Sequence, residues 1–261
     1  MTKIIIQGKG TVGLSTEMFL TQYVKDVEIL FNDTYKNCLV DATQWPTTDY
    51  VIICVNTDLD NFLPLPENSI VNVTAAMSHA AGCGFTGQFV VRSTIGIQDA
   101  VDLVKNFGDR LITWPEYTRE ASWQADSISP RMVLLGGEAE KFASLFDEGY
   151  IGPVIITEPV EAMVAKLSTN AFLSTKVVFA NQVRQLCEHH NLEYNLVSQL
   201  LTNEGRLGES HWQSPGSDGQ AGFGGKCFPK DMQTFDTALV KAGVSNRLSN
   251  AVLALNDEMR S

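Results

Sequence analysis

Short apolar runs recur along residues 1–157, and each is followed by turn-forming or helical sequence. Runs of this length with such flanks are typical of strands buried on both faces of a parallel sheet. Strands that alternate with helical segments predict an open, doubly wound α/β sheet. The predicted strands are Lys3–Gln7, Val27–Phe31, Tyr50–Val55, Gln88–Arg92, Arg110–Thr113, Arg131–Leu135 and Val154–Thr157.

The pattern changes at Pro159, after which no glycine or proline occurs until Gly205. Proline suits the first turn of a helix, so we predict one long helix from this point. Further helices are predicted at Leu192–Leu201 and within Met232–Met259, and Gly205–Gly225 is predicted to be a functional loop. Apolar residues occupy more than one face of the long helix, so we expect it to be buried between lobes or subunits. They are Met163, Leu167, Ala171, Phe172, Val178, Phe179, Val183 and Leu186.

A glycine-rich turn follows the first predicted strand and precedes the helical spacing of Leu14–Tyr23. Strand, glycine turn and helix in this order are typical of a Rossmann-type dinucleotide site. Asp33 follows the second predicted strand, at the position where such sites bind the cofactor ribose through a carboxylate. A carboxylate there repels the 2′-phosphate of NADP, so NAD is the expected cofactor. The turn residues predicted to bind the cofactor are Gly8, Gly10, Thr11, Val12 and Gly13.

Composition excludes several classes of protein. The 261 residues carry a formal charge of −11, and no basic cluster is present that would neutralise nucleic-acid phosphates. Five cysteines without a CxxC pair favour a reducing compartment, and we expect a cytoplasmic protein without a disulfide framework. The scattered histidines show no zinc-site spacing, so we expect no metal. No apolar run is long enough for a membrane span, and no signal peptide is recognised.

Cys227 lies in the most distinctive segment, the glycine-dense loop Gly222–Asp231. Lys226 and Lys230 flank it, and Asp231 follows four residues later. Ammonium groups and exposed backbone N–H groups favour the thiolate, which is the nucleophilic form of cysteine. The loop therefore predicts a nucleophile site rather than a buried structural cysteine.

Other candidate residues lie on the long helix and after two predicted strands. Lys166 and Asn170 are four positions apart, so they project from one face of the helix. Glu116 and Glu120 follow one strand and Thr94 follows another. These positions are at the carboxyl edge, where open α/β sheets bind ligands.

Seven features occur in the order found in nucleotide-sugar dehydrogenases: GKGTVG (8–13), VNT (55–57), STI (93–95), PEYTRE (115–120), the helix of Lys166 and Asn170, the stretch 206–216 and GFGGKCFPKD (222–231). The chain resembles that family along nearly its whole length, and most closely its UDP-glucose 6-dehydrogenase branch. The resemblance implies an NAD-binding Rossmann-like domain at residues 1–157. It also implies a long central helix with a small all-helical domain at residues 158–261, used for catalysis and dimerisation.

The resemblance also implies roles for single residues. Catalysis would use Cys227, Lys166, Asn170, Asp231, Glu116, Glu120 and Thr94. Cofactor binding would add Val55, Thr57, Thr94, Glu120 and Lys230 to the glycine turn and Asp33. The substrate would be bound by Glu116, Tyr117, Lys166, Asn170, Arg206, Phe223, Gly224 and Cys227, with Arg206 reaching the substrate of a neighbouring subunit.

The implied reaction is a four-electron oxidation of a nucleotide sugar, most readily UDP-glucose, by two NAD⁺ in turn. A base, Asp231 through water or Lys166, takes the hydroxyl proton in the first step. Cys227 then forms a thiohemiacetal that is oxidised to a thioester, and Glu120 or Glu116 activates water for hydrolysis. Lys166 and Asn170 would stabilise the oxyanion.

The chain departs from the family pattern in three places. We expect it to lack the C-terminal nucleotide-binding domain, the segment between Asp33 and Tyr50 is short, and Thr94 is not followed by the usual proline. Three explanations of these departures are open: a partner subunit that completes the nucleotide site, relaxed nucleotide specificity, or a truncated fragment. Two other functions stay open: a β-hydroxyacid dehydrogenase with a single oxidation, and a non-catalytic module that binds NAD or a sugar nucleotide.

Overall fold

The computed structural model describes residues 1–57, 69–119, 122–146 and 149–261. The chain forms two compact units, Met1–Lys166 and Leu167–Ser261. The boundary between them falls inside helix α6 (Pro159–His189), a few residues after the predicted domain boundary at 157/158. The assignment of cofactor binding to one part of the chain and catalysis to the other stays a prediction.

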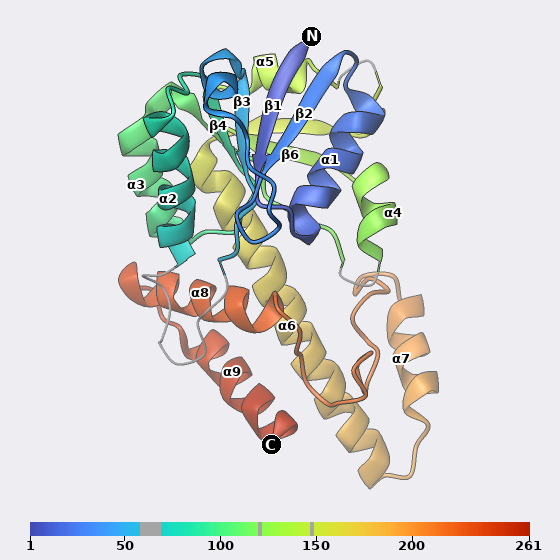
Figure 1. Cartoon of the computed structure of the whole chain (residues 1–261). Coiled ribbons are helices and arrows are strands. Elements are labelled where there is room, and N and C mark those ends of the chain that lie inside the picture. Colours follow the sequence, from blue (N-terminus) through green and yellow to red (C-terminus); the bar gives the residue numbers. More distant parts are fainter. Residues whose placement is uncertain (58–68, 120–121, 147–148) are drawn as a thin grey trace. The chain divides into compact units, whose positions relative to one another are not determined.

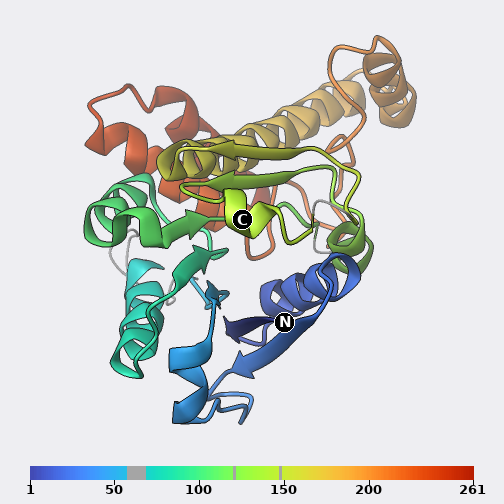
Figure 2. The ribbon, with the colours of Figure 1, turned by 90° about the horizontal axis from the view of Figure 1, so that it is seen from above.

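The described part of the first unit contains one seven-stranded sheet with the order β2-β1-β3-β4-β5-β6-β7 (Figure 2). Strands β1 to β5 run parallel, β6 is antiparallel to β5, and β7 is parallel to β6. Each predicted apolar run forms a strand, so the predicted α/β class is confirmed. The strands are β1 (Thr2–Gln7), β2 (Val27–Asn32), β3 (Tyr50–Ile53), β4 (Gln88–Val91), β5 (Leu111–Thr113), β6 (Val133–Gly136) and β7 (Val154–Thr157).

Helices cover both faces of this sheet (Figure 1). Residues of α1 and α5 pack on one face, and residues of α2 and α3 pack on the other. The helical segments of this unit are α1 (Thr11–Tyr23), η1 (Ala42–Thr47), α2 (Ser69–Gly82), α3 (Ile97–Phe107), η2 (Gly108–Arg110), α4 (Trp123–Ile128) and α5 (Glu140–Ala143).

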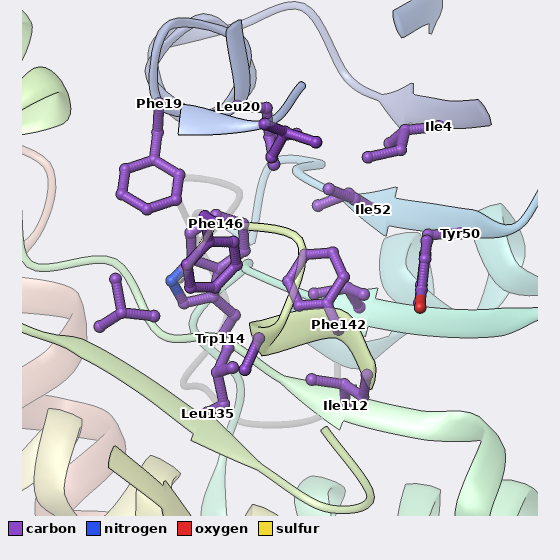
Figure 3. Close-up of a cluster of buried hydrophobic side chains, with 14 of the residues drawn as sticks. Ile4, Phe19, Leu20, Tyr50, Ile52, Ile112, Trp114, Leu135, Phe142 and Phe146 are labelled. Carbon is purple, nitrogen blue, oxygen red and sulfur yellow. The ribbon is translucent and has the colours of Figure 1, made fainter. Parts of the chain in front are cut away.

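The alternation of side chains along each strand divides the core into two clusters. On β1, Ile4 and Ile6 belong to the cluster beside α1, whereas Ile5 belongs to the cluster beside α2. The first cluster is rich in aromatic rings, including Phe19, Trp114, Phe142 and Phe146, which pack mostly edge to face (Figure 3). The apolar runs of the central strands are therefore continuous in sequence because both faces of the sheet are buried there. Edge strand β7 differs, because Ile155 and Ile156 are 45% and 38% exposed, so the prediction of a buried strand does not hold at this edge.

The second unit is helical. It contains the greater part of α6 together with α7 (Tyr194–Asn203), α8 (Phe228–Lys241) and α9 (Arg247–Arg260). Residues 204–227 form no helix or strand, in agreement with the predicted loop. The segment predicted as helical at 232–259 holds two helices, because Gly243 adopts a left-handed conformation with φ +69° and ends the first. Along the described part of the chain, no helix is long and apolar enough to cross a membrane.

The long helix is only partly buried. Leu167, Ala171 and Val178 are buried as predicted. Phe172, Phe179 and Leu186, which recur every seventh residue, are 68%, 51% and 59% exposed. The expectation that this whole apolar surface is covered therefore does not hold within the single chain.

Candidate active site

The glycine turn between β1 and α1 is shaped by close backbone contacts. Gly8 has φ +100°, and a Cβ atom there would collide with the carbonyl oxygen of Cys54. A Cβ atom on Gly13 would collide with the carbonyl of Gly8, so both positions require glycine. Gly10 differs, because a Cβ atom there would meet nothing within 4 Å.

Open space at Gly10 lies at the start of helix α1. Gly10 is the N-cap of this helix and has no side chain to cap the first N–H groups, and no acidic residue occupies the first turn. A helix start of this kind binds phosphate through its N–H groups and its positive dipole end. The residues present therefore fit the pyrophosphate of a dinucleotide.

Asp33 directly follows β2 and is tied to the glycine turn. Its carboxylate accepts hydrogen bonds from the backbone N–H of Lys9 at 2.7 Å and of Lys36 at 3.0 Å. Val55 and Thr57 follow β3, the strand that lies on the other side of β1 from β2. This is the topological switch point, where ligands bind in sheets of this kind. Thr94, half-buried, follows the next strand, β4.

Glu116 follows β5, is 13% exposed and accepts hydrogen bonds at both carboxylate oxygens. Oε1 accepts from the backbone N–H of Tyr117 at 2.9 Å and of Thr118 at 2.8 Å. Oε2 accepts from the hydroxyl of Ser15 at 3.3 Å and from the guanidinium of Arg92. Burial raises the pKa of Glu116, but the charge of Arg92 and the Thr118 N–H outweigh it, so the pKa is lowered overall.

Lys166 is the last residue of the first unit and is buried. Its ammonium lies 5.1 Å from the centre of the Tyr117 ring, a favourable cation–π distance. The structure therefore brings together three of the predicted residues of this unit, Glu116, Tyr117 and Lys166. Glu120 lies outside the described residues.

In the second unit, Asp231 is the centre of a buried polar group. Asn170 of α6 donates its side-chain N–H to Asp231 at 2.6 Å, and Lys230 donates to the other carboxylate oxygen at 2.8 Å. Asp231 lies in the first turn of α8, and its backbone N–H donates to the carbonyl of Cys227. The structure thus joins Asn170, Lys230 and Asp231 by direct bonds.

Cys227 is exposed and is the N-cap residue of α8. Pro229 is at the start of the same helix, where its missing N–H costs nothing. The positive end of a helix dipole favours an anionic group, so this position suits a thiolate.

The glycine-rich loop before Cys227 packs against α9. The buried N–H of Phe223 donates to the side-chain oxygen of Asn256 at 2.6 Å. A Cβ atom on Gly224 would approach the guanidinium of Arg260 to 2.7 Å, so this glycine lies against the end of the Arg260 side chain of α9. Sequence reasoning missed Asn256 and Arg260, because no local pattern links a residue on a distant helix to this loop.

Arg206 is 86% exposed and forms an ion pair with Glu204. The residues after it are held by Lys176 of α6, which donates to the carbonyl oxygens of Leu207 and Gly208 at 2.8 and 3.1 Å. Lys176 also lies 4.9 Å from the ring centre of Trp212. In the parts of the chain that the structure describes, no three His, Cys, Asp or Glu side chains form a group able to hold a metal.

The sequence is similar to one family model and to several curated proteins. Residues 160–258 match the model of the UDP-glucose/GDP-mannose dehydrogenase family, central domain. The UDP-glucose 6-dehydrogenase of Streptococcus pneumoniae is 27% identical over 97% of this chain and 71% of its own length. The Haloferax volcanii enzyme AglM is 30% identical over 81% of this chain and 54% of its own. TuaD of Bacillus subtilis is 29% identical over 69% and 37%.

Solved structures show the same fold. A UDP-glucose dehydrogenase from Pyrobaculum islandicum matches with a TM-score of 0.80 at 23% identity, over 99% of this chain and 68% of that one. A 3-hydroxyisobutyrate dehydrogenase from Mycobacterium tuberculosis matches with a TM-score of 0.74 at 15% identity, over 99% and 93%.

Fold and comparisons together define an α/β protein with a Rossmann-type sheet that is similar in sequence to known dehydrogenases. More particularly, the chain is a relative of the nucleotide-sugar dehydrogenases, and the resemblance expected from its motifs is confirmed. The chain spans between 37% and 71% of the length of the three curated relatives described above.

Proposed function

We propose that the protein oxidises a nucleotide-linked hexose, UDP-glucose, to its uronate with two NAD⁺ and a covalent intermediate on Cys227. The observation that carries this proposal is Cys227 at the start of α8, one turn before an Asp231 that Asn170 and Lys230 hold in place. A relative that performs a single oxidation has no need of a nucleophile at this position.

The cofactor residues fit the proposal. The glycine turn would receive the pyrophosphate of NAD⁺, and Asp33 would receive the adenosine ribose. Val55, Thr57, Thr94, Glu120 and Lys230 are the further proposed contacts. When bound, NAD⁺ accepts the hydride that leaves the sugar C6 carbon.

Two oxidations, with the addition of Cys227 between them, convert the alcohol to a thioester. Asp231 through a water, or Lys166, takes the hydroxyl proton while the C6 hydride leaves, which gives the aldehyde. The Cys227 sulfur attacks the aldehyde carbon to form a thiohemiacetal, and loss of a second hydride gives the thioester. Water then cleaves the carbon–sulfur bond, releasing the carboxylate and restoring Cys227. Glu120, or Glu116 through a water, is the proposed base for this hydrolysis.

Donors to the developing oxyanion come from Lys166 and Asn170. One N–H of the Asn170 amide is bonded to Asp231, and the amide carries a second N–H. Loss of one such donor costs about 10²–10³ in rate in enzymes of known mechanism. Tyr117, Phe223, Gly224 and, from a neighbouring subunit, Arg206 are the further proposed substrate contacts.

Cys227→Ala tests the covalent mechanism. We expect acid formation to be abolished while NAD⁺ binding is retained, with NADH counted against substrate for UDP-glucose, UDP-galactose, UDP-N-acetylglucosamine and GDP-mannose. The wild type should release two NADH per sugar with one of these donors. Cys83→Ala, at a half-buried cysteine of the first unit, is the matched control and should behave as wild type. Ordinary turnover by Cys227→Ala would exclude the proposal.

A β-hydroxyacid dehydrogenase is the second candidate. It is favoured by the fold match to the M. tuberculosis 3-hydroxyisobutyrate dehydrogenase, because the match covers 93% of that enzyme's chain. Stoichiometry separates the candidates, because a β-hydroxyacid dehydrogenase releases one NADH per product. Binding of a sugar nucleotide without any NADH release would instead favour a non-catalytic module.

The exposed apolar residues of α6 support a homodimer as the working form. Phe172, Phe179 and Leu186 recur at heptad spacing, which places them along one stripe of the helix. Burial of three such side chains is favourable, and a second copy of the chain supplies a matching stripe. We expect a dimeric mass by light scattering and a monomeric mass for Phe172→Glu combined with Leu186→Glu. A monomeric wild type would refute the dimer.

The cytoplasm is the proposed location, because the cysteines form no disulfide.

A further inference from the structure

Arg92 is a buried arginine that neither the glycine turn nor the Cys227 loop accounts for. It directly follows β4 and is 5% exposed. Its guanidinium lies 3.9 Å from the ring centre of Trp114 and forms an ion pair with Glu116. A buried arginine is costly unless its charge is paired, so the partner defines its role.

The partner, Glu116, connects three segments of the first unit. Oε1 fixes the backbone of Tyr117 and Thr118, the residues that follow it. Oε2 accepts from Ser15 of α1, and Ser15 in turn accepts from Ser127 of α4 at 2.7 Å. The carboxylate therefore links the helix of the glycine turn to the 115–119 segment, and Arg92 is the charged group that holds it.

We propose that Arg92 is a positioning residue of the candidate active site. It acts through Glu116: the ion pair holds the carboxylate, and the carboxylate sets the course of residues 117 and 118 beside α1. The catalytic part of this inference rests on the proposed dehydrogenase function. The link between Arg92 and Glu116 stands on the contacts alone.

Two cationic side chains, Arg92 and Lys166, keep the carboxylate of Glu116 ionised. Besides Arg92, the charged or titratable groups that act on Glu116 are Lys166 of α6 and the thiol of Cys54 after β3. Lys166 also lowers the pKa of Glu116, whereas burial raises the pKa of Cys54 to about 11 and keeps that thiol neutral. Arg92 is thus the larger of the two cationic contributions that keep Glu116 ionised.

The chain offers a matched control in Arg110. Its guanidinium lies 5.4 Å from the ring centre of Phe89 and donates to the carbonyl of Gly87 at 3.0 Å. It is therefore an arginine of the same unit that also packs on an aromatic ring, but the hydrogen bonds described for it go to backbone carbonyls. Arg110→Met removes the same group as Arg92→Met without affecting Glu116.

The first test measures the titration of Glu116 and needs no turnover. The protein is labelled with ¹³C at the glutamate carboxyl carbon, and the Glu116 signal is identified by its loss in Glu116→Gln. We expect Arg92→Met to raise the pKa of Glu116, Arg92→Lys to leave it low, and Arg110→Met to leave it unchanged. An unchanged titration in Arg92→Met would overturn the inference.

The second test measures kcat/KM against pH with the donor that the wild type oxidises. We expect Arg92→Met to lower kcat/KM by about 10²-fold, the cost of a small displacement of catalytic groups, and to move the acid limb to higher pH. Arg92→Lys should recover most of the loss. Arg110→Met should keep the wild-type profile, and equal losses in both methionine variants would overturn the positioning role. Absence of wild-type turnover would refute the proposed function while the titration still decides the Arg92–Glu116 link.

Discussion

The two units of the chain are stabilised in different ways. In the first unit, each face of the sheet has a large cluster of buried apolar side chains, rich in aromatic rings on the α1 side. In the second unit, the described cluster consists of Ala171, Val178, Phe223, Met232 and Val252, with partly buried neighbours. Buried polar side chains such as Lys176, Asn181 and Asn256 hold the segments that lack helix or strand there. Apolar burial therefore dominates the first unit, and specific polar bonds position the loop of the second.

Two of the buried cations, Arg92 and Lys176, are held in different ways. Arg92 of the first unit is paired with a carboxylate, whereas the bonds of Lys176 described in the second unit go to two backbone carbonyls. Burial accordingly lowers the pKa of Lys176. A paired charge can keep an anion in place beside a reaction site. A cation bonded to carbonyls instead fixes the path of the backbone, here the residues that follow Arg206.

Phe142→Ala should have the largest effect, because it breaks the apolar cluster of the first unit. Phe142 is fully buried and packs against Tyr50, Trp114 and Phe146. Removal of a buried phenylalanine typically costs about 3–5 kcal/mol of unfolding free energy. Chemical denaturation followed by circular dichroism measures the loss. Tyr35→Ala removes an aromatic ring that is 99% exposed and should change stability little. Similar losses in both variants would mean that the cluster does not dominate.

The sheet was predictable because the information for each strand is local. A strand buried on both faces needs a continuous apolar run, and β1, β3 and β4 were recognised from such runs alone. The start of α6 at Pro159 and the cofactor turn were equally local. Gly8 and Gly13 were identified by their spacing, and the structure gives the steric reason for each.

Contacts between distant segments could not be predicted. Arg92 ends a predicted strand, but its pairing with Glu116 depends on β4 and β5 being neighbours in the sheet. Asn256 gives no signal in sequence. Its partner Phe223 is 33 residues away, and no sequence motif contains both residues. The candidate catalytic residues are therefore proposed from motifs, whereas the residues that contact them required the fold.

Asn256→Ala should have a smaller effect and sharpens the contrast between the units. The substitution leaves the buried N–H of Phe223 without its acceptor, which typically costs about 1–3 kcal/mol. Asn256→Asp keeps an acceptor oxygen and should retain most of the stability. Glu188→Ala, which breaks the exposed Arg184–Glu188 pair of α6, should cost only about 0.3–0.5 kcal/mol.

The position of the loss distinguishes a specific bond from general packing. If Asn256 holds the loop before Cys227, hydrogen exchange in Asn256→Ala should rise at Phe223 and its neighbours and remain unchanged in the strands of the first unit. Asn256→Asp should keep the wild-type protection, because the carboxylate also accepts from the Phe223 N–H. Equal destabilisation by Ala and Asp, without a local rise in exchange, would show that Asn256 matters for packing in α9 and not for the loop.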